Sequence, residues 1–178
     1  MNSRTKIDRL FEGASGVKLA SKYHPKIMPF SELPIGARMA IIWYMAVDAD
    51  AWNLPEEIQG VGLEGGGKRL ANGIRKHLRY FDQVHGRTRF GYVEIPTSVL
   101  LDAIEKAHQG LEKSGKPYHK LPPTSSNSAR WLYAGSKSLT TWPCILDDTF
   151  GDILQDGWHR LDRYVEAGLP QIPCVFYT

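Results

Sequence analysis

The residues best suited to chemistry lie in one short run, Asp156-Gly157-Trp158-His159-Arg160, between an apolar segment and an amphipathic one. Glycine lets the backbone turn sharply and approach a ligand closely. A helix that begins after such a turn directs free N–H groups toward it, which favours a bound anion. Two cationic residues would then occupy the first helical turn, where the helix dipole disfavours positive charge unless a phosphate offsets it.

These features predict a phosphate-binding site made by Gly157, His159 and Arg160, and they make His159 and Arg160 candidate catalytic residues. Asp156 ends the preceding strand and is a candidate to bind a divalent metal such as Mg²⁺ or to activate a water or hydroxyl. Glu94, on another predicted strand, is a candidate second base or metal ligand. The alternatives left open are a tight turn with a capping aspartate and, for Glu94, an ordinary surface position.

Other residues with metal-binding or nucleophilic potential carry weaker signals. Asp147, Asp148 and Asp152 are candidates for a magnesium site, although such a string is usually a plain turn. The histidines have no zinc spacing. Cys144 and Cys174 have apolar neighbours in predicted strands, so we expect reduced, inert core thiols.

A cationic ridge is the second candidate site. Apolar residues recur at helical spacing over residues 68–81 and predict an amphipathic helix. Its opposite face carries the predicted nucleic-acid-binding residues Lys68, Arg69, Arg75, Lys76 and Arg79. This arrangement suits the DNA phosphate backbone without base specificity, with a solvated helix face as the alternative. Residues 62–68 match G-x-x-x-x-G-K, but Arg69 replaces the magnesium-binding Ser or Thr, which favours a glycine-rich hinge.

The elements that must position these residues alternate along the chain. Predicted strands cover residues 92–95, 142–146, 153–155 and 172–177, and predicted helices cover residues 34–47, 68–81, 99–111 and 158–167. Alternating strands and helices predict an α/β or α+β sheet with flanking helices. Thr97 or Ser98 is expected to cap the third of these helices, and Gly168 to end the last. Residues 1–30 show low periodicity and are interpreted as an extension.

Composition limits the class of protein. The chain has 178 residues, a 42% hydrophobic fraction, a 23% charged fraction and a net charge of +3. These values exclude a disordered, collagen-like or disulfide-stapled chain. With no apolar run long enough for a bilayer and no signal peptide, we expect a cytoplasmic protein without membrane insertion. We predict a helical N-terminal elaboration over residues 1–87, including the basic helix, and the main sheet over residues 88–178.

The C-terminal segment also resembles a known superfamily. Residues 142–178 contain WPCIL, DGWHR and IPCV in that order, and this pattern is similar to the ParB/sulfiredoxin superfamily. The likeness extends back over residues 92–111 and does not cover residues 1–87. Trp158 stands where sulfiredoxins carry a catalytic cysteine, and the DNA-binding module of partition proteins is not expected. Small plasmid-encoded members, some similar to nucleases and ATPases and some acting as fertility inhibitors, are the nearest group.

The resemblance implies a ParB/sulfiredoxin fold, with the DGWHR residues on the phosphates of ATP or another nucleotide. We therefore expect a phosphoester hydrolase that acts on nucleotide and DNA and inhibits DNA transfer in conjugation, where a protein of the conjugation machinery is a further candidate partner. One alternative is a nucleotide-dependent small-molecule kinase, because free-serine kinases of the superfamily carry a similar string. Another is a non-enzymatic inhibitor that binds DNA or a protein.

Overall fold

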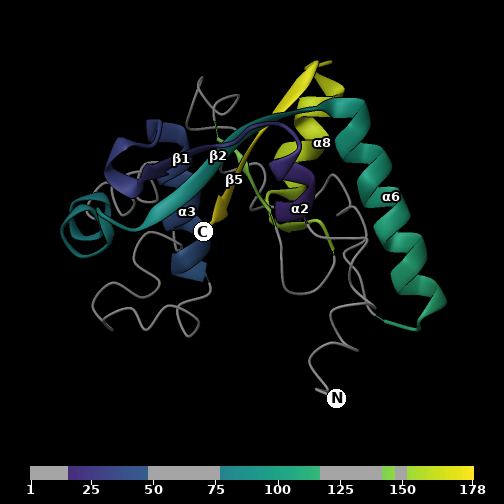
Figure 1. Ribbon diagram of the computed structural model, residues 1–178, viewed down its shortest axis with the longest axis horizontal. Helices are drawn as coiled ribbons and strands as arrows, with labels where there is room; N and C mark the ends of the chain where they lie inside the picture. Colours follow the sequence, from purple (N-terminus) through teal and green to yellow (C-terminus); the bar gives the residue numbers. More distant parts are fainter. Residues whose placement is uncertain (1–15, 48–76, 117–141, 147–151) are drawn as a thin grey trace, which may run out of the picture.

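The computed structural model describes residues 16–47, 77–116, 142–146 and 152–178. In chain order the helices are α2 (Gly16–Ser21), α3 (Ile35–Val47), α6 (Thr97–Lys113) and α8 (Trp158–Glu166), with a 3₁₀ turn η1 (Phe30–Glu32) and a further helical stretch over residues 77–85. The strands are β1 (Lys26–Pro29), β2 (Arg89–Pro96), β3 (Cys144–Leu146), β4 (Leu154–Asp156) and β5 (Gln171–Tyr177). Figure 1 shows these elements gathered around one sheet.

The sheet is mixed, with strand order β1-β2-β5-β3-β4. The β1–β2, β2–β5 and β3–β4 pairs are antiparallel, while β3 and β5 are parallel. The expected class, a sheet with flanking helices, is confirmed at this level. Strand β5 lies at the centre and is buried from Ile172 to Phe176, which is the pattern of a strand covered on both faces.

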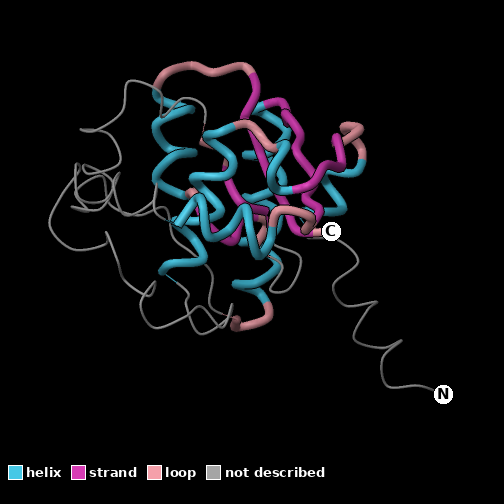
Figure 2. Tube along the Cα trace, turned by 90° about the vertical axis from the view of Figure 1, so that its left-hand side faces the viewer, coloured by secondary structure: helices cyan, strands magenta, loops and turns pink. Residues whose placement is uncertain are grey.

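Two hydrophobic clusters cover the two faces of the sheet. One joins α3, Phe81 and β-strand residues such as Val175. The other joins α6 and α8 with Cys174 and Phe176. Because successive side chains of a strand point to opposite faces, β5 contributes to both clusters in alternation. In Figure 2 the strands lie together with helices packed against them.

Most predicted elements are present, with shifted ends. The strand predicted at residues 92–95 is the longer β2, and the helix predicted at residues 99–111 is α6. The capping prediction for α6 is wrong, because Thr97 is already helical and the N-cap is Pro96. The Thr97 hydroxyl instead donates to the Leu169 carbonyl, and this bond ties the start of α6 to the loop before β5.

The expected N-terminal extension contains an unpredicted strand. Strand β1 pairs with β2 in the register Lys26↔Tyr92, so it forms one edge of the sheet. Four residues are too few to show a period-two pattern, which explains why sequence periodicity missed this strand. Elements on both sides of residue 87 therefore share one sheet.

The helix predicted over residues 68–81 falls partly outside the described residues. Residues 77–85 are helical, so this part of the prediction is confirmed and the helix ends four residues later than expected. Phe81 is fully buried and Leu78 packs against the same cluster. None of the described helices is long and apolar enough to span a membrane.

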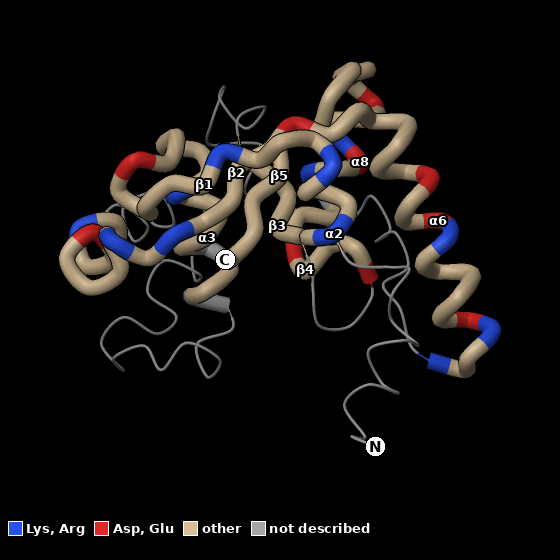
Figure 3. The backbone as a smooth tube through the Cα atoms, viewed as in Figure 1, with Lys and Arg blue, Asp and Glu red and all other residues tan. Residues whose placement is uncertain are grey.

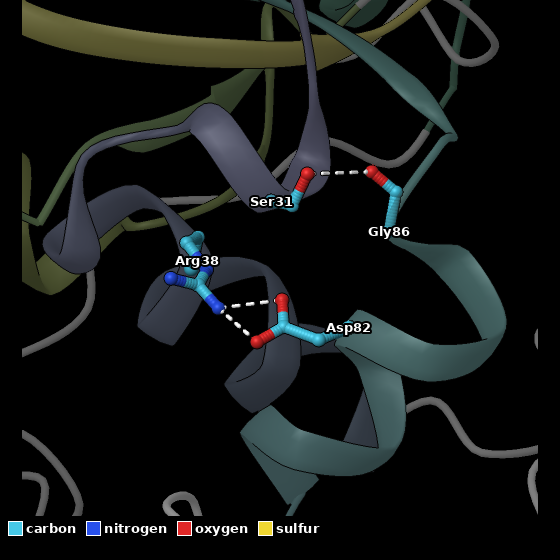
Figure 4. A network of polar contacts seen from close by, with 4 residues as sticks. All are labelled: Ser31, Arg38, Asp82 and Gly86. Carbon is cyan, nitrogen blue, oxygen red and sulfur yellow. Dashed lines mark hydrogen bonds and ion pairs between the residues drawn. The ribbon is translucent and has the colours of Figure 1, made fainter.

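A polar network joins this helix to α3 (Figure 4). Arg38 of α3 donates through Nη2 to both carboxylate oxygens of Asp82. Its guanidinium also lies over the Phe30 ring, 5.5 Å from the centroid. Ser31 donates its hydroxyl to the Gly86 carbonyl at 3.1 Å. These contacts hold η1 and α3 against residues 77–86 and engage the carboxylate of Asp82.

Gly91 tests how closely the central strands pack. A Cβ atom at this position would lie 2.1–2.6 Å from ring atoms of Phe176, its buried partner on β5. Gly91→Ala should lower the free energy of unfolding by about 1–3 kcal/mol, because the ring must move within a filled core. Gly110→Ala is the matched control, since nothing lies within 4 Å of its Cβ position. Gly110 lies within α6, so its replacement by Ala should raise the free energy of unfolding by up to about 1 kcal/mol. Denaturant unfolding measures both changes, and equal effects would contradict the packing described.

Candidate functional site

The candidate site is the turn that connects β4 to α8. Gly157 lies between them as the N-cap of α8, with φ 103° and ψ 15° in the left-handed region. A Cβ here would lie 2.9 Å from the Cys144 Cα and 3.0–3.1 Å from Nη2 and Nε of Arg160. Both the backbone conformation and this close approach therefore require glycine. Gly168, with φ 69°, ends α8 as predicted.

Arg160 folds back over this turn and is almost completely buried, with 2% of its surface exposed. Its Nη2 donates to Asp156 Oδ2 at 2.8 Å. The guanidinium carbon lies 5.9 Å from the centroid of the Trp142 ring, within the range of a cation–π contact. In the part of the chain that the structure describes, Nε and Nη1 of Arg160 are buried without a hydrogen-bond partner. Buried donors are usually satisfied, so these two call for a ligand or another explanation.

The electrostatics of the turn favour negative charge. The first turn of α8 contains no acidic residue, and its N-cap is a glycine with no side chain to cap the free N–H groups. The positive end of the helix dipole and the Arg160 guanidinium therefore lie together at Gly157. Asp156, whose side chain is 31% exposed, supplies the ion pair to Arg160. This combination is typical of a site for an anion with several oxygens.

The structure thus brings together three of the predicted residues, Asp156, Gly157 and Arg160. His159 belongs to the first turn of α8, but its side chain lies outside the described part of the structure. Glu94 is exposed on β2, and β5 and β3 separate it from β4. Three strand spacings amount to about 14 Å, so Glu94 is not brought to the site.

Metal binding at Asp156 finds little support in the donor set. One of its oxygens accepts from Arg160. Within residues 16–47, 77–116, 142–146 and 152–178, no group of three or more His, Cys, Asp or Glu side chains could hold a metal ion. Asp147 and Asp148 lie outside these residues. The residues described do not fit a resident divalent cation.

Sequence reasoning missed a polar contact between α6 and the segment that enters β4. His108 Nε2 lies 2.7 Å from Asp152 Oδ1, and the His108 ring stacks on Trp158 with centroids 5.5 Å apart. The Asp152 carboxylate therefore contacts an imidazole. Residues 152–153 form a bend, which agrees with the turn alternative, and Asp147 and Asp148 lie outside the described residues. His108 and Asp152 are 44 positions apart, so no local spacing could reveal the pair. Because Asp152 precedes β4 and Trp158 begins α8, His108 holds both ends of the turn segment.

Of the residues in the cationic ridge, only the last, Arg79, lies in the part of the chain that the structure describes. Arg79 is exposed on the helical stretch 77–85. The other predicted DNA-contacting residues, Lys68, Arg69, Arg75 and Lys76, lie outside the described residues, as does the glycine-rich run. Their proposed role stays a prediction.

Comparisons with known proteins add no relative. The chain matches no family model, no curated protein and no solved structure. The resemblance to the ParB/sulfiredoxin superfamily therefore stays a prediction, and function is inferred from the residues of the site.

Both cysteines are buried, as expected for core thiols. Cys144 donates its thiol to the Gly157 carbonyl at 3.5 Å. Burial raises the pKa of Cys144 to about 12, while Arg160 lowers it and Asp156 raises it to smaller extents. Burial also raises the pKa of Cys174, and Cys144 adds to that increase.

These thiols predict a loss of stability in alkaline solution. Above about pH 8.5 unfolded thiols lose their protons while the buried ones keep them. The free energy of unfolding should therefore fall as pH rises, by about 1.4 kcal/mol per pH unit for each thiol, until the folded pKa is reached. Cys144→Ala should show a shallower decline when unfolding is measured across this range. Identical slopes in the two proteins would contradict the assignment.

Gly157 and Gly168 form a matched pair for testing the turn. Gly157→Ala should lower the free energy of unfolding by about 2–4 kcal/mol, because it combines a strained φ with a clash against the β3 backbone. Gly168→Ala meets nothing within 4 Å and should cost only the left-handed conformation, about 1–2 kcal/mol. Thermal and denaturant unfolding measure the difference. If Gly157→Ala were as mild as Gly168→Ala, the close approach to Cys144 would be refuted.

Proposed function

We propose that this protein binds the phosphate groups of a nucleotide at the start of α8 and hydrolyses a phosphoester bond there. The observation that carries the proposal is the buried guanidinium of Arg160, which lies over the Gly157 turn with Nε and Nη1 unpartnered among the described residues. A phosphate oxygen at this turn would accept from the guanidinium and from the free N–H groups of α8.

The roles proposed for the individual residues follow from their positions. Arg160 neutralises the negative charge that grows on the phosphate in the transition state. Gly157 lets the backbone approach the phosphate, and His159 is proposed as a second phosphate ligand. Asp156, adjacent to the guanidinium at 2.8 Å, is proposed to orient the attacking water. Glu94 has no part in this arrangement because β5 and β3 separate it from β4.

A ParB/sulfiredoxin fold is part of the proposal. Its support is the likeness of DGWHR and the flanking strands to that superfamily, together with a mixed sheet in which β4, the Gly157 turn and α8 follow in the expected order. By analogy with the small plasmid-encoded members, we propose inhibition of conjugative DNA transfer as the biological role.

DNA is the proposed second partner, held by its backbone along the cationic ridge. Support comes from Arg79, Arg87 and Arg89, whose side chains are exposed. Figure 3 shows basic positions in blue in the helical stretch before β2 and at the start of β2. Asp82, in the same stretch, is paired with Arg38. Its negative charge is therefore largely offset at this surface.

Incubation of the full chain with ATP, supercoiled plasmid and Mg²⁺ tests the function. We expect phosphate release and nicked plasmid, and Arg160→Ala should reduce both by about 100-fold or more, since it removes a principal charge-stabilising donor. Arg163→Ala is the matched control, because Arg163 lies on the same helix in an exposed pair with Glu166. Circular dichroism checks that both variants fold.

The outcomes separate the alternatives. Label transferred from ATP to a free amino acid or sugar would indicate a kinase. Nucleotide binding that depends on Arg160, without turnover, would indicate a non-enzymatic binding protein. A folded Arg160→Ala variant with full activity would show that the site is wrongly assigned.

A further inference from the structure

We propose that Asp156 is an internal counter-ion of Arg160 that a phosphate dianion displaces, so that the site selects dianionic phosphoryl groups over monoanions. This inference rests on the proposed function and names the substrate class of the same site. Terminal phosphates, as in a nucleotide, belong to the selected class. Phosphodiesters of the DNA backbone carry one charge for each phosphate, so they bind this site only weakly before reaction. They gain a second negative charge as the attacking oxygen adds to phosphorus in the transition state.

The first step is the difference in burial between the two partners. Arg160 is 2% exposed and packed between the Gly157 turn and the Trp142 ring, whereas the Asp156 side chain is 31% exposed. Asp156 can therefore turn toward solvent without being desolvated. Arg160 has no such freedom, because a buried guanidinium needs a nearby negative charge. Because Arg160 stays in place, any anion that replaces Asp156 must bind at the buried guanidinium.

The second step is the number of donors. A guanidinium has five N–H donors. Asp156 accepts one hydrogen bond, from Nη2, and leaves the buried Nε and Nη1 unpartnered among the described residues. The carboxylate thus balances the charge of Arg160 but not its hydrogen-bonding capacity. A tetrahedral phosphate offers more acceptor oxygens and can serve donors that the carboxylate leaves unused.

The third step is charge. The attraction of a ligand to Arg160 grows with the ligand's charge. The free energy needed to release Asp156 is the same for every ligand. When a monoanion replaces the Asp156 carboxylate, one single charge replaces another and the free energy of binding is small. A dianion is attracted more strongly to Arg160, and this extra attraction displaces the carboxylate. Two other described carboxylates near α8 have partners of their own, since Asp152 contacts His108 and Glu166 contacts Arg163.

Calorimetric titration of the full chain tests this selection. The probes are ATP, inorganic phosphate at a slightly alkaline pH where it is a dianion, and dimethyl phosphate, a monoanionic diester. The wild type should bind the first two and not the third. Asp156→Asn should bind phosphate about tenfold more tightly, because a competing state is removed, and should gain affinity for dimethyl phosphate. Asp102→Asn is the matched control, as Asp102 forms an exposed i,i+4 pair with Lys106 on α6, and it should behave as the wild type.

Weaker phosphate binding by Asp156→Asn would overturn the inference while leaving the proposed function intact, since Asp156 would then hold Arg160 in place. No binding of any phosphate by the wild type would overturn both. If the variant does not fold, thermal unfolding of the wild type decides: phosphate should raise the melting temperature more than dimethyl phosphate at equal ionic strength. Equal increases would refute charge selection.

Discussion

The structure of the candidate site depends on one buried cation at the wrong end of a helix dipole. Arg160 lies in the first turn of α8, where both desolvation and the dipole oppose a positive charge. Asp156 and the Trp142 ring offset part of that cost. Two donors of Arg160 are buried without a partner among the described residues, and our proposal that the site receives a larger anion rests on them. This imbalance, more than any single contact, makes the turn a candidate for function.

The remaining elements hold that cation in place. The Cys144 backbone supports the Gly157 turn from β3, and the Tyr164 hydroxyl of α8 donates to the Trp142 carbonyl just before β3. From the other side, His108 of α6 contacts Asp152 and Trp158, which flank β4. The position of the turn is therefore determined by α6, α8 and β3 together. Strand β4 has only three residues and could not hold the turn alone.

Prediction from sequence succeeded where the signal is local. Gly157 and Gly168 mark the ends of α8 because glycine adopts left-handed conformations that other residues avoid. Prediction failed where a residue interacts with a partner that is distant in the sequence. Strand β1 is recognisable only by its pairing with β2, and the Thr97 hydroxyl bonds to Leu169 across 72 positions instead of capping its own helix. The candidate role of Glu94 required a strand order that no local pattern encodes.

By itself, the sequence determined the chemistry available: a glycine turn followed by cations at a helix start, an aspartate four residues before Arg160, and a sheet with helices on its flanks. These follow from backbone preference and periodicity, which act over a few residues. Only the tertiary structure decided that Arg160 is buried, that Asp156 is its partner, that Glu94 lies three strands away, and that His108 holds Asp152. Burial and pairing depend on which distant segments pack together, because desolvation is a property of the assembled core and not of any short run of residues.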